Sequence, residues 1–390
     1  MVDLCKKCFL GFGLSLLFLC LGTVFATAQE LPTDISAQAC ILMVADTHEV
    51  LFARNEQEKL PMASTTKIMT ALVALESGIP QKEITVTDEM VRVEGTSIGL
   101  LPGDTVTVQT LVAGMLLESG NDAANVTAYA VSGGIAPFLE KMNAKARELG
   151  MQNTCFETVS GLDSENHRST AYDMALLGCA AIQNPAFCAI CSQTHMRVSY
   201  GNPPYARTFS NHNKLLRACD GVFGIKTGFT KKSGRCLVSA AKRDGVTLVA
   251  VTLNAPNDWS DHNKLLDFGF SAVQKQQAFS PEQCPQIAVV GGESAFVTAT
   301  VVGDCSVALG NISAQVTTKV YVQPFLYAPV QAGDCVGRVD LFVNGEKVST
   351  RSLVAAENVA AVTRDCNEWT DDEKPKTLSE KIKAFLRMFR

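Results

Sequence analysis

Hydrophobic and polar positions follow two different patterns along the chain, and the change comes near residue 277. Between about residues 37 and 270, short apolar runs typical of strands, such as 39–45 and 237–241, alternate with stretches of helical pattern, such as 64–75 and 108–117. This mixture predicts an α/β domain, which we assign to residues 36–272.

Beyond residue 277 the apolar runs become short and rich in residues that favour strands, as at 296–302, 316–322 and 339–343. Asn344-Gly345 follows the last of these runs and is a strong signal for a β-hairpin turn. The pattern predicts a second, small all-β domain over residues 277–362, followed by a polar linker at 363–376.

The first residues read as a secretory signal. Lys6 and Lys7 precede an apolar run at 9–25, and Ala26-Thr27-Ala28 supplies the small residues of a cleavage site. We therefore predict a signal peptide over residues 1–28 and an exported protein at the outer face of the cytoplasmic membrane or in the cell-wall space. The alternative is an uncleaved anchor, because the run is near the lower length for spanning a bilayer.

The last residues carry the pattern of an amphipathic helix. Bulky apolar side chains recur at helical spacing, at Leu378, Ile382, Phe385, Leu386 and Phe389. Residues 374–390 also contain six Lys or Arg against one Glu, which suits an anionic membrane surface. We predict a membrane-anchor helix at 377–390; the alternative is a helix docked on its own protein.

Composition narrows the choice of partners and cofactors. The formal net charge of −5 argues against a nucleic-acid partner. Eleven of the fourteen cysteines lie beyond residue 28, and their disulfide state is left open. The pair Cys188 and Cys191 has no second pair at zinc-site spacing, and the five histidines show no metal-ligand spacing, so no metal and no cofactor is predicted. The histidines are expected to be loop or surface residues.

Ser64-Thr65-Thr66-Lys67 opens a helical stretch and is the strongest candidate for catalytic chemistry. Positions three apart on a helix are neighbours, so the Lys67 amine can reach the Ser64 hydroxyl. An ordinary lysine is protonated at neutral pH and cannot accept a proton. Lys67 can act as a base only if burial and a second nearby cation lower its pKa.

A second copy of the same spacing occurs at Ser239-Ala240-Ala241-Lys242. That copy lies in a run with strand character, where residues three apart point to opposite faces. Hydroxyl and amine cannot meet there, so Ser239 is predicted to be structural.

Two further motifs follow Ser64 along the chain, first Ser119-Gly120-Asn121 and then Lys226-Thr227-Gly228. With Pro102-Gly103-Asp104 and Gly161-Leu162-Asp163, they resemble the low-molecular-mass penicillin-binding proteins that are serine-type D-alanyl-D-alanine carboxypeptidases. The resemblance covers nearly the whole chain beyond the signal. It implies a penicillin-recognising serine transpeptidase-like domain, with an antiparallel sheet and flanking helices, then the all-β domain and the C-terminal amphipathic helix.

The resemblance also implies residue roles. Ser64 becomes the nucleophile that attacks the penultimate D-Ala carbonyl, Lys67 its base, and Ser119 the proton relay to the leaving group. Substrate binding is implied for Asn121, Lys226, Thr227, Gly228 and Phe229. The implied substrate is the pentapeptide stem of peptidoglycan, and β-lactams are implied as covalent inhibitors.

One feature of the family is missing from the pattern. Some relatives supply an arginine after the next strand to hold the substrate carboxylate, and residues 254–263 contain none. Carboxylate binding is then expected to rest on Lys226 and Thr227. The alternatives are a transpeptidase or β-lactamase of the same fold, the latter disfavoured by Gly120 in the second motif, and a non-catalytic wall-binding module tethered to the membrane.

Overall fold

The computed structural model describes residues 31–310, 313–363, 377, 379 and 382–383. Three predicted segments lie outside the described residues: the signal peptide at 1–28, the linker at 363–376 apart from its first residue, and the anchor helix at 377–390 apart from four residues. These assignments stay predictions.

A five-stranded antiparallel sheet organises the amino-terminal part, in the order β2-β1-β9-β8-β7. Its strands are β1 (Ala39–Val44), β2 (Val50–Arg54), β7 (Val222–Thr230), β8 (Gly234–Arg243) and β9 (Val246–Leu253). Every residue of β1 is buried, because both faces of the sheet are covered. This explains why its sequence is a continuous apolar run rather than an alternating one.

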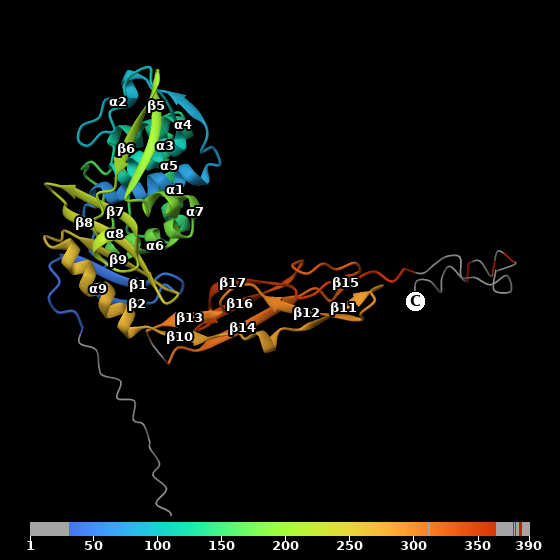
Figure 1. Cartoon of the computed structure of the whole chain (residues 1–390). Coiled ribbons are helices and arrows are strands. Elements are labelled where there is room, and N and C mark those ends of the chain that lie inside the picture. Colours follow the sequence, from blue (N-terminus) through green and yellow to red (C-terminus); the bar gives the residue numbers. More distant parts are fainter. Residues whose placement is uncertain (1–30, 311–312, 364–376, 378, 380–381, 384–390) are drawn as a thin grey trace, which may run out of the picture.

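Alternate residues of β1 enter two different cores. Ile41 and Met43 join the larger core, which is built mainly with α1, α3, α4 and α6, whereas Leu42 and Val44 pack with α9. The longer helices are α1 (Lys67–Glu76), α3 (Val108–Leu117), α4 (Asn121–Ser132), α5 (Ile135–Glu148), α6 (Ala171–Ile182) and α9 (Asp258–Ala272). The result is a sheet with helices on both faces (Figure 1).

Shorter elements complete the amino-terminal part. They are η1 (Ala63–Thr66), α2 (Asp88–Val91), α7 (Pro185–Cys191), α8 (Leu215–Ala218) and the paired strands β3 (Glu83–Thr85) with β4 (Thr105–Thr107) and β5 (His195–Gly201) with β6 (Pro204–Ser210). The β5–β6 ribbon reaches the helical region, where the Tyr200 hydroxyl donates a hydrogen bond to the Ile98 carbonyl at 2.6 Å.

The carboxy-terminal part is all β, with a small 3₁₀ turn, η2 (Pro281–Gln283). Its six-stranded sheet has the order β14-β16-β17-β12-β11-β15, and β10 pairs with β13. The strands are β10 (Gln274–Gln277), β11 (Gln286–Val290), β12 (Phe296–Val301), β13 (Ser306–Leu309), β14 (Val316–Val322), β15 (Phe325–Tyr327), β16 (Cys335–Val343) and β17 (Glu346–Ala355). The predicted hairpin joins β16 to β17, with φ 50° at Asn344 and 86° at Gly345.

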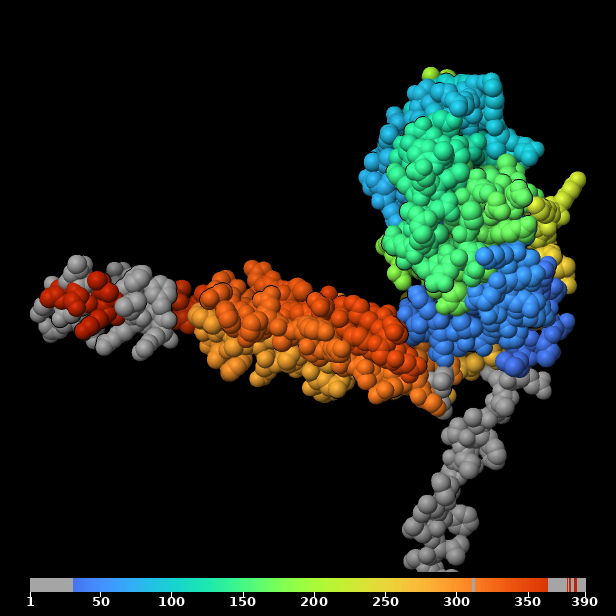
Figure 2. All heavy atoms as spheres, turned by 180° about the vertical axis from the view of Figure 1, so that it is seen from behind, coloured from blue at the N-terminus to red at the C-terminus, as the bar shows by residue number. Residues whose placement is uncertain are grey.

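The β-rich part projects sideways from the sheet end of the amino-terminal part (Figures 1 and 2). Near the junction, the Gly310 amide donates a hydrogen bond of 2.9 Å to the Glu49 carboxylate. The three sequence motifs that begin at Ser64, Ser119 and Lys226 all lie in the amino-terminal part, so the candidate site belongs to that part alone.

The predicted fold class is confirmed: an α/β domain with an antiparallel sheet and flanking helices precedes an all-β domain. The helix predicted at 64–75 differs in detail, because its first turn is the 3₁₀ segment η1 and the α-helix begins at Lys67. Within the described chain, no single helix is both long and apolar enough to cross a membrane, and only the bent pair α6 and α7 reaches that threshold when taken together. All ten cysteines that the structure describes are free thiols.

Candidate active site

Ser64 lies in the η1 turn at the start of α1, which brings its hydroxyl one helical turn from the Lys67 amine. The Ser64 Oγ to Lys67 Nζ distance is 3.0 Å. Gly161 backs this turn so closely that a Cβ at its position would lie 1.9 Å from the Ala63 carbonyl oxygen. A side chain at residue 161 would therefore displace the serine, and its φ of 89° also favours glycine.

The Lys67 amine is completely buried and has three oxygen neighbours. Besides Ser64 Oγ, these are Asn121 Oδ1 at 2.7 Å and the Ser160 carbonyl oxygen at 2.6 Å. The last two can only accept hydrogen bonds. A neutral amine gives its two N–H groups to these acceptors, which leaves its lone pair directed at the Ser64 hydroxyl.

Two physical effects favour the neutral form of Lys67. Burial lowers its pKa well below the ordinary value, and the positive charge of Lys226 lowers it further, whereas Asp122 opposes the shift. The sequence requirement for a second cation is therefore met by the lysine of the third motif.

Lys226 lies on β7 and is also buried, with its Nζ 2.9 Å from the Thr227 carbonyl oxygen. Burial lowers the pKa of Lys226 to about 7. Below about pH 7 Lys226 therefore keeps its proton, and its positive charge is the one that lowers the pKa of Lys67.

The second motif lies where α3 gives way to α4. Ser119 has the left-handed φ of 62°, a costly conformation for a residue with a side chain. Thr96 stabilises it by donating a hydrogen bond of 2.6 Å to the Ser119 carbonyl. One N–H of the Asn121 amide is donated to the Glu94 carbonyl at 2.7 Å, so the amide oxygen is turned towards Lys67.

Thr227, Gly228 and Phe229 lie on β7, which is the edge strand of its sheet. A Cβ at Gly228 would lie 3.0 Å from the Ser64 backbone nitrogen, so a side chain here would push β7 away from the η1 turn that carries Ser64. Phe229 is 64% exposed, so its ring is not part of the packed core.

These elements enclose one cleft. Six of the eight predicted site residues line it: Ser64, Ser119, Asn121, Thr227, Gly228 and Phe229. The other two, Lys67 and Lys226, lie buried behind this lining. The tertiary structure thus gathers all eight predicted residues around a single space.

Sequence reasoning missed several residues of the cleft and its support. His212, Arg235, Asp258 and Trp259 also line the cleft. His167 is buried behind the η1 turn. Its Nδ1 accepts a hydrogen bond from the Glu157 amide at 3.0 Å, and its Nε2 lies 2.8 Å from Thr66 Oγ1. Burial lowers the pKa of His167 to about 4, so it is neutral.

The expectation of loop or surface positions is wrong for His262, which is buried within α9 between Ser239 and Thr252. Single histidines leave no periodic signal in the sequence from which such contacts could be predicted. Ser239 itself is buried on β8, whereas Lys242 is exposed. The second Ser-x-x-Lys copy is therefore structural, as predicted.

Comparison with known proteins agrees with this geometry. The family model described as D-alanyl-D-alanine carboxypeptidase matches residues 24–257, and the model described as penicillin-binding protein 5, C-terminal domain, matches residues 274–361. The chain is 30% identical to D-alanyl-D-alanine carboxypeptidase DacF of Bacillus subtilis, over 86% of this chain and 90% of the relative. It is 35% identical to D-alanyl-D-alanine carboxypeptidase DacC of Escherichia coli, over 90% and 91% of the two chains.

Among solved structures, penicillin-binding protein 5 of Haemophilus influenzae superposes with a TM-score of 0.61 at 27% identity, covering 85% of this chain and 99% of that one. Family, relatives and fold agree over both parts of the molecule. The chain belongs to the D-alanyl-D-alanine carboxypeptidase family of penicillin-binding proteins.

Proposed function

We propose that this protein is a serine-type D-alanyl-D-alanine carboxypeptidase that removes the terminal D-Ala from peptidoglycan pentapeptide stems through an acyl-enzyme on Ser64. One observation carries the proposal. The buried Lys67 amine faces the Ser64 hydroxyl at 3.0 Å, while its other two close neighbours can only accept hydrogen bonds.

Acylation follows from that arrangement. Ser64 Oγ attacks the carbonyl carbon of the penultimate D-Ala, and its proton passes to the Lys67 lone pair. The developing oxyanion is held by the backbone N–H groups of Ser64 and Phe229, in the roles that the family resemblance implies. The close approach of β7 to the η1 turn at Gly228 supports this pairing.

Collapse of the tetrahedral intermediate breaks the peptide bond. The leaving D-Ala nitrogen takes a proton that originates at Lys67 and is relayed through the Ser119 hydroxyl. Water then attacks the Ser64 ester and gives a proton to Lys67, which passes it to Ser64 Oγ as the ester bond breaks and the shortened tetrapeptide leaves. Lys226 and Thr227 bind the free carboxylate of the terminal D-Ala, and Asn121 orients both Lys67 and the substrate backbone. β-Lactams acylate Ser64 in the same way and act as covalent inhibitors.

The proposal extends to the remaining parts of the chain. Residues 1–28 direct export, residues 36–272 form the catalytic domain and residues 277–362 the β-rich domain. The linker at 363–376 connects it to the amphipathic helix at 377–390, which attaches the enzyme to the outer face of the cytoplasmic membrane. The apolar stripe and basic residues of the last segment support this attachment. Deleting 377–390 and fractionating cells tests it, and unchanged membrane association would contradict it.

The activity is tested by measuring D-Ala release from a pentapeptide stem with the wild type and Ser64→Ala. We expect a tetrapeptide and free D-Ala from the wild type only, and a labelled penicillin bound covalently to the wild type only. Cross-linked dimers as the main product would instead identify a transpeptidase. Absence of any penicillin adduct on the folded wild type would leave the non-catalytic wall-binding module as the better interpretation.

A further inference from the structure

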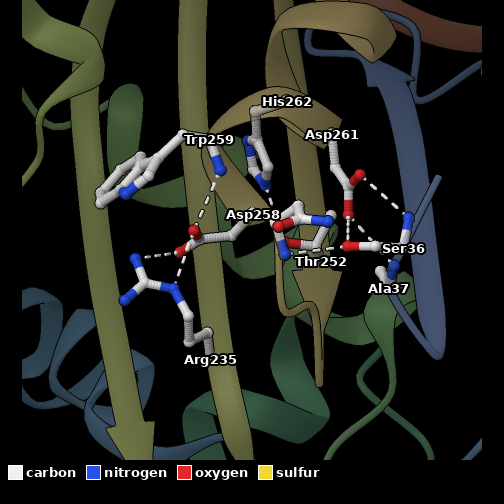
Figure 3. Close-up of polar contacts among 9 residues, drawn as sticks. Ser36, Ala37, Arg235, Thr252, Asp258, Trp259, Asp261 and His262 are labelled. Carbon is white, nitrogen blue, oxygen red and sulfur yellow. Dashed lines mark hydrogen bonds and ion pairs between the residues drawn. The ribbon is translucent and has the colours of Figure 1, made fainter.

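The cleft contains an arginine that the sequence pattern did not predict. Some members of the family carry this arginine after the next strand, but residues 254–263 contain none. Arg235 instead enters the cleft from β8, together with Asp258 and Trp259 of α9. Figure 3 shows the guanidinium alongside the Asp258 carboxylate, with the Trp259 ring nearby.

Arg235 is held in one orientation by two parallel hydrogen bonds. Its Nε and Nη2 atoms each lie 2.9 Å from an Asp258 carboxylate oxygen. Asp258 is only 2% exposed, whereas the Arg235 side chain is 39% exposed. A bidentate pair of this kind fixes the plane of the guanidinium as well as its position. The exposed portion belongs to the cleft lining.

Asp258 lies at the amino end of α9, which is fixed by further hydrogen bonds. The Trp259 amide donates a hydrogen bond of 3.0 Å to the Asp258 carboxylate, and the Arg235 guanidinium carbon lies 5.3 Å from the Trp259 ring centroid. One turn further along α9, Asp261 accepts hydrogen bonds from the Ser36 and Ala37 amides, at 2.9 and 3.1 Å. The amino end of α9 is therefore a rigid base for the arginine (Figure 3).

Arg235 has N–H donors that its pair with Asp258 leaves free. A guanidinium has five N–H groups, and the two contacts with Asp258 engage one on Nε and one on Nη2. Three N–H groups remain, two of them on Nη1. These donors are positively charged and suit a carboxylate ligand in the cleft.

Strand register places these donors near the predicted carboxylate site. Arg235 is directly opposite Phe229 in the β7–β8 pair. Phe229 and Thr227 are two residues apart and therefore share a face of the sheet. Arg235 is thus a diagonal neighbour of Thr227, and such neighbours lie about 7–8 Å apart, within reach of long side chains.

We propose that Arg235 is a substrate-binding residue that hydrogen-bonds the free carboxylate of the terminal D-Ala, together with Thr227 of the neighbouring strand. Asp258 and Trp259 are its positioning residues. The inference rests on the proposed carboxypeptidase function and adds a specificity residue to it. It also replaces the expectation that carboxylate binding rests on Lys226 and Thr227 without an arginine.

The chain offers a matched control on the same strand. Arg243, at the far end of β8, also pairs with an aspartate of α9, with Nη1 2.9 Å from Asp267, and lies 4.6 Å from the Phe270 ring centroid. Arg243 does not line the cleft. Replacing it removes the same kinds of contact and leaves the substrate site untouched.

The experiment compares two peptides, one ending in a free D-Ala-D-Ala carboxylate and one with that carboxylate converted to an amide. We expect Arg235→Ala to lower kcat/KM about 10- to 100-fold for the acid, the loss typical of a charged hydrogen bond. For the amide the change should stay below about threefold, because the partner of the guanidinium is absent. Arg243→Ala should match the wild type on both peptides.

Three outcomes are decisive. Unchanged kcat/KM of Arg235→Ala on the acid, or equal losses on acid and amide, would overturn the proposal, the latter because a purely structural role affects both peptides alike. If Arg235→Ala does not fold, Arg235→Lys takes its place and must show a smaller loss that is still selective for the acid. A wild type that releases no D-Ala contradicts the proposed function instead, before any variant is compared.

Discussion

The two buried lysines of the cleft and a buried aspartate of the β-rich part differ in the partners that surround them. In the cleft, Lys67 and Lys226 are at most 1% exposed, and neither makes an ion pair with any residue that the structure describes. In the β-rich part, Asp340 is 4% exposed, accepts a hydrogen bond of 2.7 Å from Thr350 and lies within 4 Å of two cationic side chains, Arg338 and Lys347.

The difference separates function from stability. A buried cation without a carboxylate partner loses its proton easily, which costs folding free energy but creates a base. A buried carboxylate that accepts hydrogen bonds from neighbouring donors contributes to the stability of the fold. The two regions therefore predict opposite responses to substitution.

Removing the cleft amine should have the largest effect. We expect Lys67→Ala to lower the rate of acylation by a labelled penicillin about 10²- to 10⁴-fold, the usual contribution of a general base. Lys242→Ala, in the second Ser-x-x-Lys copy, should acylate like the wild type because Lys242 is exposed on β8. Comparable rates for Lys67→Ala and Lys242→Ala would show that Lys67 is not the base.

The pH dependence sharpens the comparison. Lys226 has a pKa of about 7, so its charge is lost above that pH and acylation by carboxylated ligands should slow. An unfolded lysine keeps its proton up to about pH 10.4. Between these pH values the unfolded state binds more protons, so stability should rise with pH while activity falls.

Acylation rates and urea unfolding, both measured from pH 6 to 10, test this opposition. An acylation rate that stays constant from pH 7 to 10 would contradict the assigned cation. A stability that falls over the same range would contradict the burial of an easily deprotonated lysine.

The smallest expected effect belongs to the β-rich part. Asp340→Ala removes the acceptor for Thr350 and should lower the free energy of unfolding by about 1–2 kcal/mol. D-Ala release per folded molecule should be unchanged, because Asp340 lies outside the cleft. Chemical denaturation and the release assay on one preparation measure both quantities. Lost activity at unchanged stability would show that the β-rich part takes part in catalysis.

Much of the fold followed from the sequence because the relevant signals are local. The fully apolar run of β1 and the Asn344-Gly345 turn each depend on neighbouring residues, and the structure has both. Ser64 was separated from Ser239 by periodicity alone, since helices and strands point residues three apart in different directions. The 3₁₀ start at Ala63–Thr66 was missed, since patterns locate element ends poorly.

The residues of the candidate site also fall into those that the sequence predicted and those that only the tertiary structure revealed. The family motifs identified eight residues around the cleft, together with the requirement that Lys67 have a second cation. No motif pointed to Arg235, because its place in the cleft depends on two long-range features. These are its strand register opposite Phe229 and its ion pair with a buried aspartate 23 positions later in the chain.

Local order along the chain thus determines which residues form each strand and helix, and which motif carries the nucleophile. Contacts between distant segments decide the rest. They bury two lysines 159 positions apart so that the charge of one lowers the pKa of the other, and they bring an arginine into the cleft from β8 rather than from the segment after β9. The physical reason is that burial, charge and register are properties of packed neighbours, and a linear pattern does not contain them.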